Sequence, residues 1–248
     1  MKRLLSSGVS IIVCISLLTM SFSSAPGAQS LLDNAVQRLN AIHSIDYSIS
    51  DKRAYTINGS KREETITTRI KVVYKGRNSA DISVKLSGSD GTKFDVYYKD
   101  GYVYQNLYGI KSRTRIGSIP IDPVDSLMLQ VPGSQLRDAE VTKTEDGGHK
   151  VVVRISNELI TSIFKDSVAE SLKSSGHTDI QLGLSDFKTT YTLDKSGNLK
   201  TVVNTFSVKA VTSKGSHLEQ YRQSIRINST NALSSVGFPP DLSSYTTH

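Results

Sequence analysis

Residues 30–43 carry apolar side chains at helical spacing. These side chains recur every three or four positions and form one stripe, which consists of Leu31, Leu32, Ala35, Val36, Leu39 and Ile42. Ser30 precedes the stripe and is a suitable N-cap. The pattern predicts an amphipathic helix that packs on another element.

From residue 45 the apolar period shortens to two. Apolar and polar residues alternate along five runs, at residues 45–49, 66–74, 80–86, 94–98 and 102–108. Tight-turn pairs such as Asn58-Gly59, Asp90-Gly91 and Asp100-Gly101 separate most of them. The pattern predicts a meander of about five antiparallel strands, each with one apolar and one polar face.

The second half of the chain continues with fewer, longer elements. Pro120 and Pro132 flank residues 124–131, where one or two helical turns are expected. Pro239 and Pro240 exclude a central strand from the tail. The remaining predicted elements are a strand starting at Val141, a strand at 151–155, a helix at 156–175, and strands at 187–193, 202–210 and 221–227.

Strands gathered in hairpins, with few helices, predict an α+β domain. Because long sheets twist and curl, we expect a curled antiparallel sheet, an unclosed half-barrel, with amphipathic helices packed on its concave face.

The N-terminus has the layout of a secretory signal peptide. Lys2 and Arg3 precede an uncharged apolar stretch, and small residues follow up to Ala28. We therefore expect residues 1–28 to be the signal peptide, residues 29–248 to form a single domain, and the protein to be extracytoplasmic, either secreted or associated with the cell envelope. An uncleaved membrane anchor is the alternative. Cys14, the only cysteine, follows large residues rather than the small residue of a lipoprotein signal, so no lipid anchor is expected.

The chain is basic, with a formal net charge of +7. Removing Lys2 and Arg3 lowers +7 to +5, and the remaining basic residues are dispersed. Scattered charge of this kind is typical of a solvated surface, with a weak, salt-sensitive attraction to an anionic membrane surface. Nucleic-acid binding is not expected, because Asp95 and Asp100 offset Lys93 and Lys99 within the main aromatic cluster.

Four segments resemble the LolA-like superfamily: IDYSIS after the first helix, the hairpin FDVYYKDGYVYQ, the turn TLDKSGNLKTV and the tail FPPDLSSY. The superfamily includes lipoprotein carriers, mycobacterial lipid-transport lipoproteins and secreted Gram-positive relatives without assigned function. The resemblance spans about Leu31 to Tyr245 and implies an unclosed barrel whose concave face holds acyl chains or a lipidated partner. The hydrophobic and basic residues that known carriers use at the mouth cannot be aligned with this chain.

Known catalytic and metal-binding motifs are missing from the sequence. Its five histidines form no helical His-x-x-x-His pair, and there is no G-x-S-x-G elbow or phosphate-binding glycine loop. We therefore expect a protein that is not an enzyme and that uses no cofactor or metal. Two carboxylates brought together by the fold would instead indicate a secreted hydrolase.

Tyrosines are concentrated between Phe94 and Gly109 in a chain without Trp. A tyrosine ring is apolar while its hydroxyl seeks a hydrogen-bond partner, which suits the wall of a lipid cavity. The hypothesis is a hydrophobic cavity between sheet and helix, lined by Ile82, Val84, Tyr98, Tyr102, Tyr104, Leu159, Ile163 and Phe164. A filled core without a cavity is the alternative.

The sequence thus predicts a non-enzymatic protein that binds a lipid, a lipidated molecule or another hydrophobic ligand in a half-barrel. The alternative is a protein–protein interaction or sensing module of the cell envelope that has a filled core and binds an envelope protein.

Overall fold

The computed structural model describes residues 26–57, 60–76, 79–118, 122–128, 139–161, 181–212 and 215–247. Its helices are α1 (Pro26–Asn40), α2 (Pro123–Leu127) and the 3-10 turn η1 (Leu242–Ser244). Its strands are β1 (Ser44–Ile57), β2 (Ser60–Gly76), β3 (Ser79–Gly88), β4 (Lys93–Lys99), β5 (Tyr102–Leu107), β6 (Ile110–Arg115), β7 (Glu140–Lys143), β8 (His149–Arg154), β9 (Gln181–Leu193), β10 (Leu199–Thr212), β11 (Gly215–Thr230) and β12 (Thr246–Thr247).

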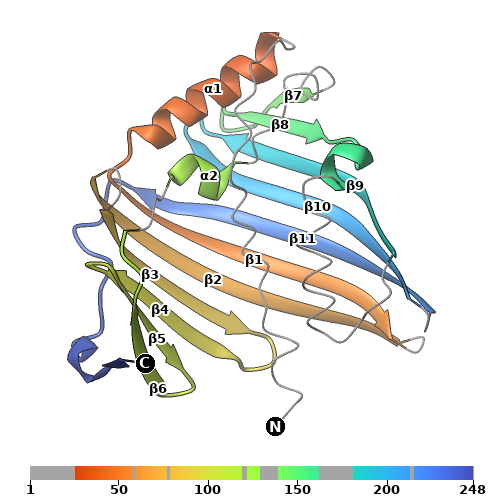
Figure 1. The fold of residues 1–248 in the computed structure, drawn as a ribbon. Coiled ribbons are helices and arrows are strands. Elements are labelled where there is room, and N and C mark those ends of the chain that lie inside the picture. Colours follow the sequence, from red (N-terminus) through yellow and green to blue (C-terminus); the bar gives the residue numbers. More distant parts are fainter. Residues whose placement is uncertain are drawn as a thin grey trace.

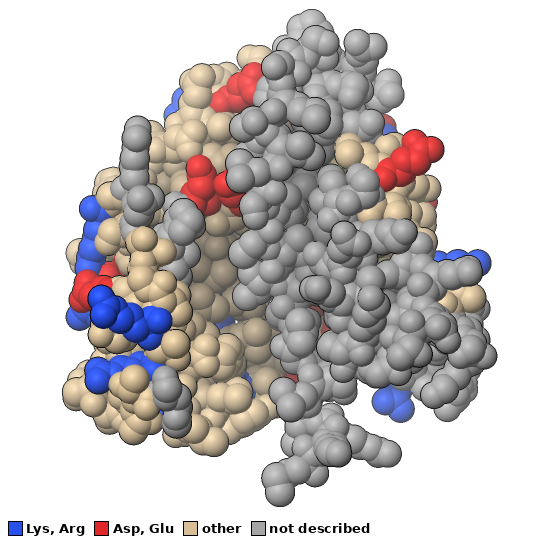
Figure 2. Space-filling view, viewed as in Figure 1, with Lys and Arg blue, Asp and Glu red and all other residues tan. Residues whose placement is uncertain are grey.

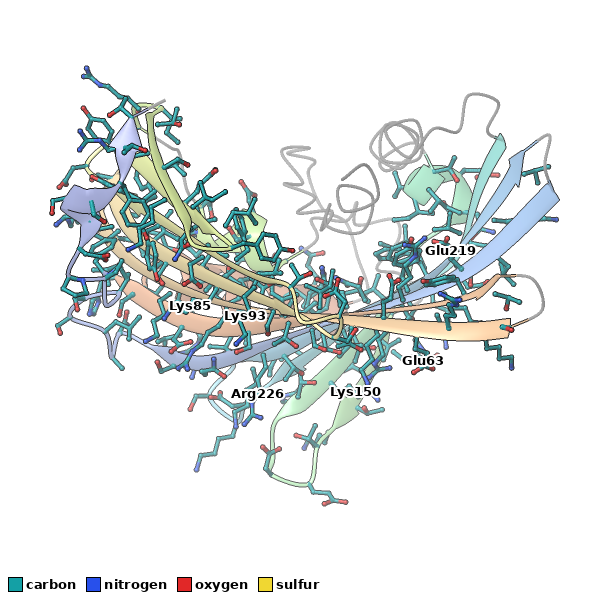
Figure 3. The ribbon with its side chains drawn as sticks, turned by 90° about the horizontal axis from the view of Figure 1, so that it is seen from below. Glu63, Lys85, Lys93, Lys150, Glu219 and Arg226 are labelled. Atoms are coloured by element: carbon teal, nitrogen blue, oxygen red, sulfur yellow. The ribbon has the colours of Figure 1, made fainter. Side chains whose placement is uncertain are left out.

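All of these strands belong to one sheet in the order β12-β6-β5-β4-β3-β2-β1-β11-β10-β9-β8-β7. Neighbours are antiparallel except β12 and β6, which are parallel. The sheet curls into an open half-barrel whose two arms rise on either side of β1 (Figure 1, Figure 3). We call β2–β6 with β12 the left arm and β7–β11 the right arm. The predicted fold class, a curled and unclosed antiparallel sheet with few helices, is confirmed.

The core lies where helices cover the concave face of the sheet. Leu32, Ala35 and Leu39 of α1 are buried in the same cluster as Ile45 and Val72 from β1 and β2. The helix begins at Pro26, before the expected Ser30, and Ala28 already belongs to the core. The predicted amphipathic stripe of α1 therefore closes one end of the half-barrel, which we call the near end.

Helical structure also covers the right arm. Residues 157–161 are helical within the described chain, and Ile160 is fully buried in the core. The rest of the helix predicted at 156–175 lies outside the described residues. α2 is shorter than the predicted segment 124–131; Asp122 caps it by accepting a hydrogen bond of 2.7 Å from the Val124 N–H. In the described part of the chain, no helix is long and apolar enough to cross a membrane.

The left arm contains an element that the apolar pattern does not predict. β6 has the sequence IKSRTR, in which Ile110 is the only apolar residue. It pairs with β5 along its whole length, so the meander runs to six strands. Its positive side chains suit a strand near the sheet edge, where charge discourages pairing with other chains.

The C-terminal tail packs on the outer face of the left arm. Tyr97 contacts Phe238 with ring centroids 6.2 Å apart, and Tyr104 contacts Tyr245 at 5.6 Å, both edge to face. Lys111 forms an ion pair with Asp241. After η1 the tail ends in β12 beside β6, so the irregular segment that the prolines predict covers a face and an edge of the sheet.

Candidate functional site

The concave face continues beyond the helices as an apolar surface on the left arm. Its side chains are half-buried and come from β2, β3 and β4: Ile70, Val84, Leu86, Phe94 and Val96. We call these five residues the apolar wall. Val84 pairs with Ile70 on one side and Val96 on the other, so one continuous row of apolar side chains crosses three strands. Figure 2 shows a recess on this side of the molecule, lined mainly by uncharged residues.

Four of the predicted cavity residues lie on the concave side. Ile82 pairs with Tyr98 across β3 and β4, and Val84 lies two residues from Ile82 on the same face. Ile82 and Leu159 both pack against the main core. Tyr98 is buried, and its hydroxyl donates a hydrogen bond of 2.7 Å to the Gly117 carbonyl, which satisfies the polar end of the ring.

Tyr102 and Tyr104 lie on the opposite face, which corrects the predicted lining. The turn of Asp100 and Gly101, with φ of 51° and 81°, pairs Tyr98 with Val103 and Tyr97 with Tyr104. Directly paired residues share a face, so Tyr104 lies on the outer side with Tyr97, beneath the tail. The structure therefore does not bring these two tyrosines together with Ile82, Val84 and Tyr98.

Ile163 and Phe164 lie outside the described residues. The part of the predicted lining that the structure brings to one side of the sheet is thus Ile82, Val84, Tyr98 and Leu159.

A polar row crosses the right arm on the same concave face. Four side chains at successive register positions of β1, β11, β10 and β9 form it: Asp51, Gln223, Asn204 and Thr189. The Thr189 hydroxyl donates to Asn204 Oδ1 at 2.9 Å, and Asn204 Nδ2 donates to Gln223 Oε1 at 3.1 Å. Gln223 Nε2 then donates to Asp51 Oδ1 at 3.0 Å. We call these four residues the polar row.

An aromatic row runs beside the polar row. Phe187 stacks on Phe206 with centroids 5.7 Å apart, and Phe206 stacks on Tyr221 at 4.9 Å with the ring planes 5° apart. The guanidinium of Arg53 lies 6.0 Å from the Tyr221 ring and 4.7 Å from the Tyr55 ring. Because these planar groups stack face to face, they present their edges beside the hydrogen-bonded side chains.

A charged group completes this region at the far end of the half-barrel. Arg53 Nε and Nη2 donate to the two carboxylate oxygens of Glu219 at 2.9 and 2.5 Å, and Arg53 Nη1 lies 3.8 Å from Glu64. Burial by itself would lower the pKa of Arg53, but the bonds to Glu219 outweigh it and raise the pKa. For Tyr221, in contrast, burial raises the pKa, and the hydroxyl donates a hydrogen bond of 2.5 Å to Glu219. Figure 3 shows Glu219 on the inner side of the curled sheet, with Lys85, Lys93 and Arg226 on the outer side.

The carboxyl group of Asp51, which is half-buried, has a raised pKa. Burial raises its pKa, and the hydrogen bond from Gln223 offsets only part of this effect. Its cross-strand partner on β2 is Ile66, so no cation faces it directly from that strand. Asp46, on the opposite face of β1, behaves differently: burial would raise its pKa, but hydrogen bonds from Arg69 and Asn228 hold it below the ordinary value.

Replacing Asp51 by asparagine should stabilise the protein increasingly as the pH rises. A raised pKa in the folded state means that the stability contributed by Asp51 is fully present below the unfolded pKa of about 3.8 and is lost as the pH rises through the folded pKa. Asp51→Asn removes this loss, so its melting temperature relative to wild type should climb between acidic and neutral pH.

Asp46→Asn provides the opposite control for this prediction. A lowered pKa contributes stability above about 3.8 that is lost as the pH falls, so this variant should fall further below wild type as the pH rises. Melting temperatures of the three proteins across this pH range test both signs. Parallel curves for Asp51→Asn and wild type would contradict the assignment for Asp51.

The polar row has a signal in the sequence that the apolar pattern alone does not interpret. β1, β10 and β11 each carry a polar residue where the apolar alternation of their concave face stops or is interrupted: Asp51, Asn204 and Gln223. Arg53 follows Asp51 on the same face of β1 and Glu219 lies on the same face of β11, whereas Asn204 is a single interruption within β10. Only the register of the sheet reveals that the three interruptions are neighbours.

The described residues hold no group of three or more His, Cys, Asp or Glu that could bind a metal ion. The acids of the concave face are engaged with neighbours: Glu219 and Glu64 with Arg53, and Asp51 with Gln223. Among the described residues the concave face thus presents an apolar wall on one arm and hydrogen-bonding side chains on the other.

No protein-family model matches the chain, and no curated protein matches it. By structure it is similar to the Mycobacterium tuberculosis lipoprotein LppX, with 12% sequence identity, a TM-score of 0.48, and coverage of 86% of this chain and 100% of that chain. It is also similar to the LolA superfamily protein NE2245 from Nitrosomonas europaea, with 12% identity, a TM-score of 0.25, and coverage of 87% and 96%.

A third match is the complex of MucA and MucB from Pseudomonas aeruginosa, with 14% identity, a TM-score of 0.29, and coverage of 84% of this chain and 59% of that chain. All three are structural similarities at low sequence identity. At these identities and TM-scores they assign no function to this chain.

Proposed function

We propose that this protein is a non-enzymatic, extracytoplasmic binding protein that holds a lipid, a lipidated molecule or another hydrophobic ligand on the concave face of its sheet. The apolar wall is the observation that carries this proposal. Its five side chains form a contiguous surface, and they are only partly buried, unlike the fully buried residues of the core. A contiguous apolar surface that stays partly open to water is typical of a binding site.

The contrast between the two ends of the concave face supports the same proposal. At the near end, Ile45 and Val72 are 1% and 3% exposed beneath α1, so that part of the face is a filled core. Along the left arm, the row through Ile70, Val84 and Val96 remains partly open. An apolar ligand lying there would remove this surface from water, which is favourable by about 25 cal/mol per Å².

Extracytoplasmic localisation belongs to the same proposal and rests on the signal-peptide pattern of residues 1–28. A chain beginning at residue 29 would lack Ala28, which is 1% exposed in the core. Experiments should therefore use protein that the host has exported, so that its N-terminus is the one that export produces and not a chosen cut at residue 29.

Binding of a neutral apolar dye tests the proposed function. The full chain is expressed in a secreting host, and the exported protein is purified without detergent. N-phenyl-1-naphthylamine fluoresces strongly in apolar surroundings, so we expect a saturable rise in fluorescence that dodecane reverses. An exported, folded protein that produces no rise would favour the alternative, an envelope protein-interaction module with a filled core.

A further inference from the structure

The polar row is not required by the fold. The sheet satisfies its own backbone hydrogen bonds, and apolar residues at all four positions would continue the faces of their strands. Replacing a hydrogen-bonded pair by apolar groups of similar shape is often nearly neutral for stability. Four polar side chains aligned across four strands of a concave face therefore indicate a use for their hydrogen-bonding groups.

The row extends from a fully buried end to an accessible one. Thr189 is 0% exposed, whereas Asn204, Gln223 and Asp51 are half-buried. The side-chain amides of Asn204 and Gln223 each use one N–H and one oxygen lone pair to bond their neighbours in the row, and Asp51 accepts through Oδ1. A primary amide carries a second N–H, and a carboxyl group has a second oxygen. The accessible end of the row can thus both donate and accept hydrogen bonds, and a hydroxyl group is the partner that does the same.

The charges beside the row argue against an anionic partner. The positive charge of Arg53 is matched by Glu219 and Glu64 at 2.5 and 3.8 Å. Arg62 shares the face of Tyr55 through their pairing, and it is the other described cation at this end of the face. With Asp51 of the polar row, two cations face three acids, so no surplus positive charge is left to attract a phosphate or a carboxylate.

Besides hydrogen-bonding partners, a hydroxylated head group needs an apolar surface for its C–H groups, and the aromatic row supplies one. Phe206 and Tyr221 are half-buried and stack in parallel planes next to Asn204 and Gln223. The rings stack on one another, so their apolar edges line the face beside the polar row. The C–H groups of a sugar or other polyol can pack against these edges while its hydroxyl groups reach the polar row.

We infer that the ligand of this protein is an amphiphile with an uncharged, hydroxyl-bearing head group, and that the head group binds inside the half-barrel, on the polar row and the stacked rings of the right arm. This inference rests on the proposed function and adds the chemical class and the orientation of the ligand. The hydrocarbon part lies against the apolar wall of the left arm.

Head-group competition tests the inference. The exported full-length protein is loaded with N-phenyl-1-naphthylamine, and three compounds with the same dodecyl chain compete below their micellar concentrations: dodecyl maltoside, dodecanoate and dodecyltrimethylammonium. Dodecyl maltoside should displace the dye at a concentration at least about tenfold lower than the two charged compounds, as one or two additional hydrogen bonds would produce.

The variant with Thr189→Val, Asn204→Leu, Gln223→Leu and Asp51→Leu replaces the whole row and should lose this preference while it still binds the dye. Gln223→Met is a second variant with a smaller change. If the fourfold variant does not fold, the maltoside preference of Gln223→Met is compared with that of wild type instead. Arg222→Leu is the matched control, because Arg222 is an exposed neighbour on the opposite face of β11. It should keep the preference for maltoside.

Preferential displacement by dodecanoate or dodecyltrimethylammonium, or a maltoside preference that Gln223→Met leaves unchanged, would overturn the inference while the binding function stands. A wild-type protein that binds no dye would overturn the binding function and the inference with it.

Discussion

Replacing Val84 by aspartate should weaken binding of an apolar ligand by about tenfold to a hundredfold while the protein stays folded. Val84 is half-buried at the centre of the apolar wall, between Ile70 and Val96. Burying a valine side chain contributes about 1.5–3 kcal/mol, and each 1.4 kcal/mol changes an affinity tenfold. A carboxylate at this position removes that contribution and must also stay hydrated. Dye titration of the exported protein measures the effect.

Ser87→Asp is the control for the Val84 variant. Ser87 lies three residues further along β3, on the opposite face, where it is exposed and pairs with Lys93. It introduces the same charge into the same strand and should leave dye affinity unchanged. Equal affinities of Val84→Asp and wild type would mean that the apolar wall is not the binding surface.

Of the proposed variants, truncation of Ile45 to alanine should cost the most stability, with the free energy of unfolding reduced by about 2–5 kcal/mol. Ile45 is 1% exposed, pairs with Val72 on β2, and lies in the core cluster that α1 covers. Its removal leaves a cavity that the long strands on either side cannot collapse to fill. For a domain of this size the melting temperature should fall by roughly 5–15 °C. Calorimetry or urea unfolding checks this value.

Ile110→Ala makes the same chemical change at a position that is 70% exposed, at the start of β6. It should alter stability by no more than about 0.5 kcal/mol. A similar loss in both variants would contradict the separation of a filled near end from the open surfaces of the sheet.

The period of apolar residues was sufficient to predict most elements of this fold. The stripe from Leu31 to Leu39 lies in α1, which ends at Asn40, before the predicted Ile42, and the alternating runs are strands of a single curled sheet. The pattern did not predict β6, because this outer strand has one apolar residue, Ile110, and therefore shows no alternation of apolar and polar positions. The packing of the tail through Phe238 and Tyr245 also escaped it, because a proline-rich segment signals an irregular backbone and not the face that it covers.

The candidate site was harder to predict because it depends on register. Tyr98, Tyr102 and Tyr104 are all at even positions, but the hairpin pairs Tyr98 with Val103 and so places Tyr102 and Tyr104 on the outer face. Conversely, Asp51, Gln223 and Asn204 are far apart in the sequence and look like isolated polar interruptions. A shift of one residue in pairing would exchange the faces, so neither result follows from the period alone.

Native mass spectrometry of the exported protein, purified without detergent and measured before and after denaturation, tests the central claim most directly. We expect a mass above that of the mature chain in the native spectrum, with the excess released as a lipid or another apolar molecule on denaturation. A native mass equal to that of the chain alone, together with no binding of added N-phenyl-1-naphthylamine, would contradict the claim that the concave face is a ligand site.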